Sequence, residues 1–246
     1  MIPKTLHYCW FGRNPLSKSA QKCVDSWRRY CHEYEIVEWN ENNFDINMNE
    51  YTKKCYFEKK FAFFSDYVRL FVIYNYGGIY LDTDVEIIKS FDNLLTASAF
   101  FGFENNYFIN TGEGFGAEKK SKIVKMMLDE YNNLLDGTHD YEACPKMNTR
   151  AIKKYGFEIN GNYQCINGIQ LFPIDYFNPL NSNTGKLKIT DNTYSIHWYS
   201  QSWLSPLDRI RSKTTRPFHR LFGEDCFSCL KNRKSSHAKK IESTDL

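Results

Sequence analysis

The fold of this chain is constrained most by an apolar segment that two glycines divide. Residues 61–76, FAFFSDYVRLFVIYNY, are apolar on most faces of a helix, which predicts a helix that is largely buried. Gly77 and Gly78 follow, and glycine readily adopts the left-handed backbone that ends helices. The next residues, IYLDTDVEII, predict a buried strand that leads directly into Asp82 and Asp84. A buried helix followed at once by a buried strand predicts an α/β core with two carboxylates at its edge.

The opening of the chain predicts a strand, a helix and a second strand. Residues 4–12 (KTLHYCWFG) read as the first strand, and residues 34–39 (YEIVEW) alternate like the second. Between them, apolar residues recur at helical spacing from Ser17 onward. Further predictions are a helix at 50–60, a strand at 98–104, a glycine-rich turn at 110–119, a helix at 121–135, and short strands and loops beyond 140. We therefore expect a mixed, mostly parallel sheet flanked by helices.

Basic residues gather near the end of the chain. The whole sequence has a formal net charge of +3, but residues 209–240 alone carry about +8. We expect one domain over residues 1–208 and a basic appendage, helical or irregular, over residues 209–246. Its interspersed Phe and Leu would allow docking on anionic lipid, although a solvated, mobile tail is equally consistent. Nucleic-acid binding is disfavoured because no recognisable nucleic-acid motif accompanies the charge.

Cysteine usage and the N-terminus predict a reduced compartment. The eight cysteines are scattered, and several fall in apolar patterns that are typical of buried thiols. The one CxxC, Cys226 to Cys229, lacks a second pair, which disfavours a zinc or redox site. The first residues do not resemble a signal peptide, and no run of about 18 apolar residues occurs. We therefore expect a cytoplasmic protein.

Asp82 and Asp84 are the first candidate site. In an extended strand they would face the same side, where two carboxylates repel each other unless a divalent cation binds between them. Such a cation keeps open positions for diphosphate oxygens. The spacing alone is weak, because acid–x–acid also occurs at apparently solvated positions such as Asp140 and Glu142. The position at the carboxyl end of a buried strand strengthens it, since open α/β sheets bind ligands there.

Asp66 and Arg69 are the second candidate site. They stand three residues apart on one face of an otherwise apolar helix, where an unpaired charge would be costly. One interpretation is a simple ion pair within the helix. The other is that Arg69 reaches a phosphate or a sugar hydroxyl, for which its planar guanidinium is well suited.

The segment FFSDYVRLFVIYNYGGIYLDTDV resembles the SD-x-x-R…Y-x-x-GGIYLDTD signature of the DXD-containing sugar transferases, glycosyltransferase family 32. That family includes bacterial capsule and O-antigen enzymes and yeast Golgi mannosyltransferases, and the clostridial glucosylating toxins are distant relatives. IPKTLHYCWFG, SWRRYCHEYEIVEW and SIHWYSQSW resemble further elements of the family. The resemblance covers roughly residues 2–203. It implies a GT-A-type, Rossmann-like nucleotide-sugar-binding fold.

The resemblance also implies roles for the catalytic set. Asp66 and Arg69 would hold the sugar and phosphate of the donor. Asp82 and Asp84 would be the DXD pair that binds Mn²⁺ or Mg²⁺, and His197 would be a third metal ligand or a diphosphate contact. From the residues alone, His197 is also typical of a packed histidine in an aromatic stretch.

Further donor contacts are implied around this set. Trp10 would stack on the nucleobase, although a tryptophan at a strand end is as typical of the core. Tyr80 and Asn110 would face the donor, with Asn110 at its sugar. Ser202 and Trp203 would close over the diphosphate.

The implied function is a metal-dependent, retaining glycosyltransferase. It would move a hexose or N-acetylhexosamine from a nucleotide sugar, a UDP-sugar rather than GDP-mannose, to a lipid-linked oligosaccharide in bacterial capsule or O-antigen synthesis. It would work at the inner face of the cytoplasmic membrane. A toxin-like transferase that glycosylates a protein and a catalytically silent nucleotide-sugar-binding protein are the alternatives. Retention leaves two routes open: a covalent intermediate on a carboxylate such as Glu104 or Glu113, or front-face attack.

Overall fold

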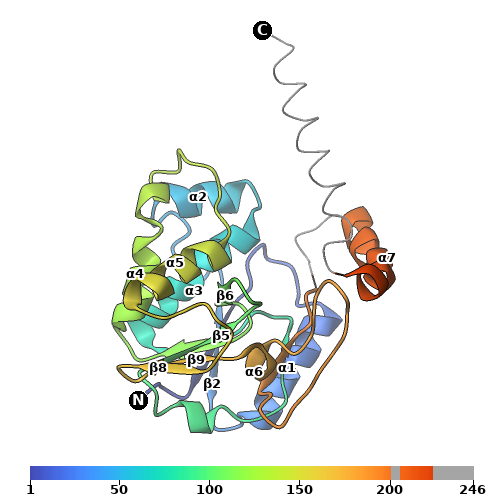
Figure 1. Ribbon diagram of the computed structural model, residues 1–246. Coiled ribbons are helices and arrows are strands. Elements are labelled where there is room, and N and C mark those ends of the chain that lie inside the picture. Colours follow the sequence, from blue (N-terminus) through green and yellow to red (C-terminus); the bar gives the residue numbers. More distant parts are fainter. Residues whose placement is uncertain (201–205, 224–246) are drawn as a thin grey trace. The chain divides into compact units, whose positions relative to one another are not determined.

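The computed structural model describes residues 1–200 and 206–223 (Figure 1). The chain divides into two compact units. The first holds residues 1–180 and 188–203, and the second holds residues 181–187 and 204–246. The predicted Ser202 and Trp203, the CxxC and the last part of the basic appendage therefore lie outside the described residues.

The first unit opens with a strand, a helix and a strand, as the sequence predicts. β1 (Thr5–Cys9) and β2 (Glu35–Trp39) pair in parallel. α1 (Lys18–Tyr30) connects them and begins at Ser17, whose side chain accepts a hydrogen bond from a backbone N–H in the first turn. The buried face of α1 carries Trp27, and this face packs beneath the strand that follows the two aspartates.

The apolar segment before the two glycines is helical, and a strand follows it directly. α2 (Glu50–Phe57) leads into α3 (Phe61–Tyr76), which ends where Gly77 takes a φ of 71°. Gly78 has a φ of 99° and begins β3 (Gly78–Tyr80), which pairs in parallel with β1. A Cβ at Gly78 would lie 2.7 Å from a carbonyl oxygen of β1, so this position excludes any side chain.

The residues IYLDTDVEII do not form the single strand that we expected. β3 ends at Tyr80, and the backbone N–H of Val85 donates to the carbonyl of Asp82 at 3.0 Å, which closes a turn over the two aspartates. The chain then enters β4 (Val85–Ile87), which pairs antiparallel with β10 (Ser195–His197) in a separate two-stranded sheet. The aspartates are therefore brought together by a turn and not by the alternation of a strand.

Eight strands of the described chain form one mixed sheet in the order β2-β1-β3-β7-β5-β9-β8, with β6 paired to β5. Its remaining strands are β5 (Ala99–Phe103), β6 (Ile109–Asn110), β7 (Phe115–Ala117), β8 (Gln164–Ile166) and β9 (Ile169–Phe172). Pairing is parallel across β2-β1-β3 and again between β5 and β9, and antiparallel between the other neighbours. β3, the last strand of the parallel group β2-β1-β3, leads into the turn that holds Asp82 and Asp84.

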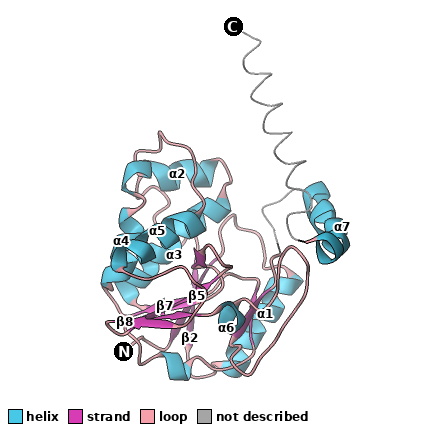
Figure 2. Ribbon diagram, viewed as in Figure 1, coloured by secondary structure: helices cyan, strands magenta, loops and turns pink. Residues whose placement is uncertain are grey.

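The region beyond residue 140 is more helical than we expected. α5 (Cys144–Tyr155) is a helix of 12 residues with a proline in its first turn and Gly156 in the left-handed conformation at its end. It follows α4 (Lys122–Asp129), and a short helix, α6 (Ile174–Phe177), comes after β9. Figures 1 and 2 show α2, α3, α4 and α5 on one side of the large sheet and α1 and α6 on the other. The sheet thus separates two layers of helices.

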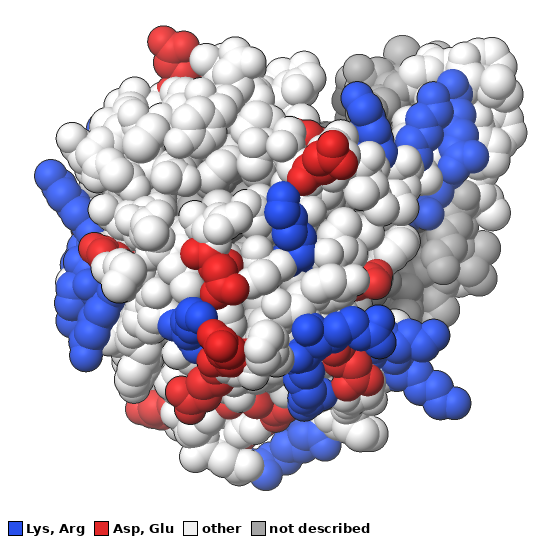
Figure 3. Space-filling view, turned by 90° about the horizontal axis from the view of Figure 1, so that it is seen from below, with Lys and Arg blue, Asp and Glu red and all other residues white. Residues whose placement is uncertain are grey.

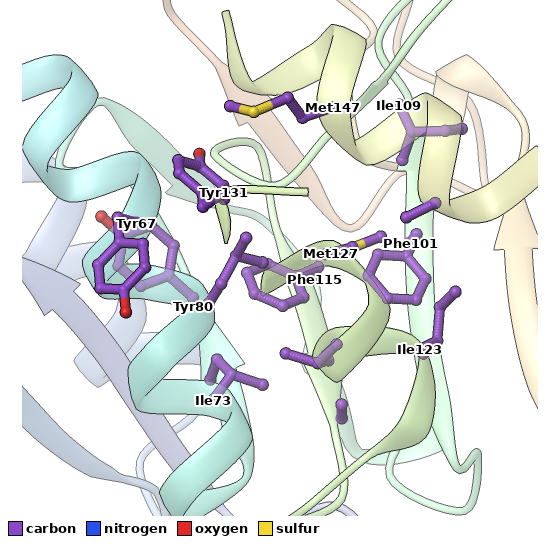
Figure 4. Packing of buried hydrophobic residues seen from close by; sticks show 14 of the residues in the cluster. Tyr67, Ile73, Tyr80, Phe101, Ile109, Phe115, Ile123, Met127, Tyr131 and Met147 are labelled. Atoms are coloured by element: carbon purple, nitrogen blue, oxygen red, sulfur yellow. The ribbon is translucent and has the colours of Figure 1, made fainter. Parts of the chain in front are cut away.

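Apolar side chains fill both sides of the sheet. On the side of α3 to α5, Ile73, Phe115 and Met127 interdigitate between helix and strand, as Figure 4 shows. A second cluster on the other side includes Trp27 of α1 and Phe177 of α6. Because both clusters are closed by helices, the rigid sheet fixes the strand ends from which the candidate site is built.

The second unit contains α7 (Pro206–Phe222), so the described part of the basic appendage is helical. Within this unit, Arg220 donates to the carbonyl oxygens of Thr184 and Gly185 at 2.6 and 3.3 Å. The described helices are all too short or too polar to cross a bilayer. Figure 3 shows acidic and basic side chains intermixed on the face of the molecule that it draws. The six cysteines in the described ranges are free thiols, and four of them are buried.

Candidate active site

The candidate site lies where the turn after β3 meets α3 and the end of β10. The turn supplies Asp82 and Asp84, α3 supplies Asp66 and Arg69, and β10 supplies His197. These residues are far apart in the sequence. They meet because β3 follows α3 directly, and because β4 brings β10 alongside the turn.

Arg69 is buried and links two carboxylates from different elements. Its Nη2 lies 2.9 Å from Asp66 Oδ1 and 3.1 Å from Asp82 Oδ1, while Nε donates to the carbonyl of Ser65 at 3.3 Å. Its guanidinium carbon also lies 4.9 Å from the centre of the Tyr80 ring. The expected ion pair between Asp66 and Arg69 is therefore present. Arg69 also contacts Asp82, so it links α3 to the turn of residues 82–85, which we call the DXD turn.

The backbone around Gly112 supplies further contacts that hold Asp82 in place. The backbone N–H of Asp82 donates to the carbonyl of Gly112 at 2.9 Å, and the Tyr80 hydroxyl donates to Asp82 Oδ1 at 3.1 Å. A Cβ at Gly112 would collide with Asp82 Oδ2 and lie 2.9 Å from Nη1 of Arg69. Only glycine lets the chain pass so close to both charged groups.

Asp84 is held by the chain around His197. His197 Nε2 lies 3.3 Å from Asp84 Oδ1, and the backbone N–H of Ser200 donates to Asp84 Oδ2 at 2.7 Å. The backbone carbonyl of Asp84 accepts from the N–H of Trp198 at 2.9 Å. Both the side chain and the backbone of Asp84 thus contact the segment that follows β10.

Asp82, Asp84 and His197 form a cluster that can hold a divalent cation. Each offers one ligand atom, and these atoms all lie within 4.8 Å of one another. Two carboxylates and one imidazole suit Mn²⁺, and carboxylate oxygens also suit Mg²⁺. His197 is 7% exposed and the two aspartates are partly exposed, so the cluster opens to solvent on the side of the carboxylates. The residues present fit a metal with free positions.

Charge and burial shift the pKa values of these groups in different directions. Burial raises the pKa of Asp66 to about 6 despite the charge of Arg69, and burial also raises the pKa of Asp82. Burial would raise the pKa of Asp84, but His197 and Ser200 outweigh it and hold that pKa below its ordinary value. Burial would lower the pKa of His197, yet the charge of Asp84 raises it to about 9. A cation that binds His197 must therefore displace a proton.

Residues 17–101 match the model of a protein family described as "Glycosyltransferase sugar-binding region containing DXD motif". Residues 17–101 thus carry the sequence pattern of a DXD glycosyltransferase sugar-binding region. The match confirms the resemblance inferred from the sequence. The DXD region contains the Asp66–Arg69–Asp82 bridge and Asp84, whereas His197 comes from outside it.

Curated relatives match parts of the chain. Lactosylceramide 4-alpha-galactosyltransferase of Mus musculus is 26% identical over 152 residues, which cover 56% of this chain and 41% of that protein. Inositol phosphoceramide mannosyltransferase 3 of Schizosaccharomyces pombe is 36% identical over 106 residues, or 38% of this chain and 27% of that protein. The chain thus spans well under half the length of these relatives.

A solved structure supports the fold around the DXD region. PaToxG Glycosyltransferase superposes with a TM-score of 0.51 at 17% identity, covering 63% of this chain and 69% of that chain. The expected glycosyltransferase fold, with a mixed sheet flanked by helices, is confirmed.

Two further predicted residues lie near the DXD turn without a direct contact to it. Trp10 comes directly after β1, whose carboxyl end lies beside that of β3, and its indole N–H donates to the carbonyl of Asn14 at 2.6 Å. The side-chain oxygen of Asn110 accepts from the N–H of Gly112 at 2.8 Å, so Asn110 supports the glycine that faces Asp82. Their contacts with a donor stay predictions.

Sequence reasoning missed other residues of the site. Gly112 was read only as part of a glycine-rich turn, and Ser200 was not singled out. Glu113, which we considered only as a nucleophile, is fully buried beside this turn. The run NTGEGFG was a usable signal for a close backbone approach, but it did not show what the backbone approaches.

Proposed function

We propose that this protein is a metal-dependent glycosyltransferase that moves a hexose or N-acetylhexosamine from a nucleotide sugar to an acceptor hydroxyl. The observation that carries the proposal is the convergence of Asp82, Asp84 and His197, whose ligand atoms lie within 4.8 Å, beside the buried Arg69. The match of residues 17–101 to the DXD family supports it. Asp82, Asp84 and His197 would hold Mn²⁺ or Mg²⁺.

The chemistry requires negative charge to be stabilised on the departing diphosphate. A bound cation supplies part of this stabilisation. Arg69 supplies a second positive charge, which Asp66, Asp82 and the carbonyl of Ser65 hold in place before the donor arrives. Because the guanidinium is already oriented, little reorganisation is needed as charge develops.

The two carboxylates that we considered for a covalent route differ in their exposure to solvent. Both oxygens of Glu113 are enclosed, so this side chain does not reach a substrate in the described conformation. Glu104 is partly exposed, and burial raises its pKa while a hydrogen bond with Asn110 opposes the shift. A covalent route would therefore use Glu104, and a front-face route would need neither carboxylate.

The proposed acceptor is a lipid-linked oligosaccharide, and the proposed donor is a UDP-sugar. The names of two similar proteins, which refer to lactosylceramide and inositol phosphoceramide, support a lipid-anchored acceptor. Following the family resemblance, we place the reaction in bacterial capsule or O-antigen synthesis, at the cytoplasmic face of the membrane. The basic appendage would then provide contact with anionic lipid.

A calorimetric screen tests the donor site. The purified protein is titrated with UDP-glucose, UDP-galactose, UDP-N-acetylhexosamines and GDP-mannose, each with Mn²⁺ or with EDTA. We expect one UDP-sugar to bind and to be slowly hydrolysed only with Mn²⁺. Asp84→Asn should abolish both effects, and Asp140→Asn, at an exposed acid–x–acid position, should leave them unchanged. Full activity of Asp84→Asn would contradict the site.

The acceptor is tested separately. Transfer of labelled sugar into a solvent-extractable lipid fraction is expected, and label found only in protein by mass spectrometry would favour the toxin-like alternative. Donor binding without any hydrolysis or transfer would favour a catalytically silent binding protein.

A further inference from the structure

Glu113 is a buried acid whose carboxylate finds no counterpart in the described residues. It lies between β6 and β7 and is 0% exposed, and no group of the described chain hydrogen-bonds to either of its oxygens. Burial raises the pKa of Glu113 well above its ordinary value, and the neighbouring charge of Glu104 adds to the shift. Burying a carboxyl group without a partner is costly, so a role in the site would explain its presence.

His197 has a matching unsatisfied atom. Its Nε2 faces Asp84 at 3.3 Å, so Nδ1 lies at a different edge of the ring. Nδ1 is buried, and it too lacks a hydrogen-bond partner within the described ranges. The Tyr199 ring stacks on the imidazole with centroids 4.2 Å apart, which covers one face and leaves the Nδ1 edge as the point of further contact.

The strand geometry brings these two groups to the same region. Ser195 and His197 point to the same side of β10 because side chains alternate along a strand. The Ser195 hydroxyl donates to the backbone carbonyl of Glu113 at 3.2 Å, which places Glu113 on that side. Asp84, Asp82 and Glu113 favour the charged form of His197, and Glu104 also interacts with it. Asp84 contacts Nε2, and of the two glutamates it is Glu113 whose backbone contacts β10 through Ser195.

We propose that Glu113 is a positioning residue for His197. One of its oxygens accepts a hydrogen bond from a single water molecule to which Nδ1–H donates, and this bridge turns Nε2 toward Asp82 and Asp84. In histidine metal sites the nitrogen that does not bind the metal commonly donates to a carboxylate in this way. The consequence for metal binding rests on the proposed function, whereas the hydrogen bond itself does not.

The variants are chosen by whether the side chain at position 113 can accept a hydrogen bond. A carboxylate, a carboxylic acid and a primary amide each have an oxygen that accepts a hydrogen bond, so Glu113→Gln keeps the interaction. Glu113→Leu removes it at similar volume, and Glu113→Met is a second apolar variant in case Leu does not fold.

Nuclear magnetic resonance of metal-free protein labelled with ¹⁵N-histidine tests the hydrogen bond directly. We expect a slowly exchanging, downfield Nδ1–H signal that His197→Gln identifies by its absence. The signal should persist in Glu113→Gln and disappear in Glu113→Leu and Glu113→Met. A signal unchanged in a folded apolar variant, or no protected Nδ1–H in the wild type, would overturn the proposal.

Mn²⁺ affinity, measured by electron paramagnetic resonance, and thermal unfolding separate positioning from plain packing. Glu113→Leu should bind Mn²⁺ about 10- to 100-fold more weakly. It should also unfold at a lower temperature, because Nδ1–H of His197 is left buried without an acceptor, whereas Glu113→Gln should keep both the affinity and the unfolding temperature. Wild-type affinity in Glu113→Leu, or an equal loss of affinity in Glu113→Gln, would contradict the role.

A matched control is Tyr131→Phe, which removes another enclosed polar atom for which the described residues offer no partner. It should leave Mn²⁺ affinity unchanged. If the wild type binds no Mn²⁺, the proposed metal site fails, and the resonance experiment still decides the role of Glu113.

Discussion

Arg69 joins the helix before the glycines to the turn after them. Its side chain is 4% exposed and contacts carboxylates that stand 3 residues before it and 13 residues after it. The same nitrogen, Nη2, contacts both carboxylates, while Nε donates to the carbonyl of Ser65, so the planar guanidinium is fixed by two of its nitrogens. The stability of the turn and the charge offered to a donor therefore depend on the same side chain.

Substitution of Arg69 should reduce turnover and stability together. Arg69→Ala leaves the partly buried carboxylates of Asp66 and Asp82 without their cation, which costs about 3 kcal/mol of unfolding free energy. Donor hydrolysis should fall by roughly 100-fold or more. Both are measured on purified protein, by urea unfolding and by release of the nucleotide. Arg150→Ala, at an exposed arginine paired with Glu130 and Glu142, is the control, and a near-normal rate in Arg69→Ala would leave only the ion-pair interpretation.

His7 is a buried histidine outside the site that must stay neutral. Trp39 Nε1–H donates to its Nδ1 at 3.1 Å, and Nε2 lies 3.0 Å from the carbonyl of Gly77. With Nδ1 as acceptor, Nε2 carries the proton and donates. Burial lowers the pKa of His7 to about 4, against the smaller opposing effect of Gly77.

This lowered pKa predicts an acid-sensitive contribution to stability. The unfolded chain binds a proton near pH 6.5 and the folded one only near pH 4, so the contribution is complete above 6.5 and is lost as the pH falls toward 4. The loss amounts to about 3 kcal/mol. Urea unfolding of wild type and His7→Gln at pH 7.5 and 4.5 isolates it, and equal pH dependence of the two proteins would show that His7 does not titrate this way.

At the scale of elements, the connection between β6 and β7 shapes the site as much as the DXD turn does. It brings the backbone of Gly112 against Asp82 and buries the side chain of Glu113. The site thus combines two turns of the large sheet, the one after β3 and the one between β6 and β7, with residues of α3 and β10.

Gly112→Ala should therefore impair the metal site while the fold persists. The new Cβ would displace the Asp82 carboxylate, and we expect Mn²⁺ affinity to fall at least tenfold. Isothermal titration calorimetry measures the affinity. Gly156→Ala, where nothing lies within 4 Å but φ is +116°, should lose stability and keep its affinity. Equal affinities in the wild type and Gly112→Ala would show that Asp82 tolerates the displacement.

Local spacing was enough to predict some elements and not others. The helix over 61–76 was predicted because its apolar residues and the glycines after it act locally. The single strand over 79–88 was wrong, because its two halves pair with strands from opposite ends of the unit. α5 was not predicted, because charged residues are interspersed among its apolar ones and make its amphipathic pattern weak in the sequence. In the structure its apolar face packs against α4.

The residues of the candidate site likewise fall into those that could be predicted from the sequence and those that could not. Asp66, Arg69, Asp82 and Asp84 were predictable, because their spacing carries the chemistry and the family signature. Glu113 was predictable only as an acid in a glycine-rich run, since its contact with Ser195 depends on a strand more than 80 residues away.

At the scale of the whole molecule, the two units carry different properties. The first unit contains both apolar cores and the candidate site, and the second includes most of the basic residues near the end of the chain. Donor binding and any attraction to anionic lipid should therefore be separable by mutation.

Replacing the five basic residues of segment 231–240 with Gln tests this separation. Each basic residue near an anionic surface contributes about 1 kcal/mol, so co-sedimentation with vesicles rich in phosphatidylglycerol should weaken more than tenfold. Donor affinity should not change, and neutral vesicles should bind neither protein. Equal sedimentation of variant and wild type would favour the solvated tail.

The hydrogen bonds that Ser200 and Trp198 donate to Asp84 have a consequence for metal binding. Oδ2 of Asp84, which accepts from Ser200, belongs to the carboxylate that a cation would share. A cation bound to this carboxylate would compete with the backbone N–H of Ser200 for the lone pairs of Oδ2, and so weaken a hydrogen bond that holds the backbone just beyond β10. Metal binding at Asp84 would then act directly on the backbone at Ser200, without an intervening side chain.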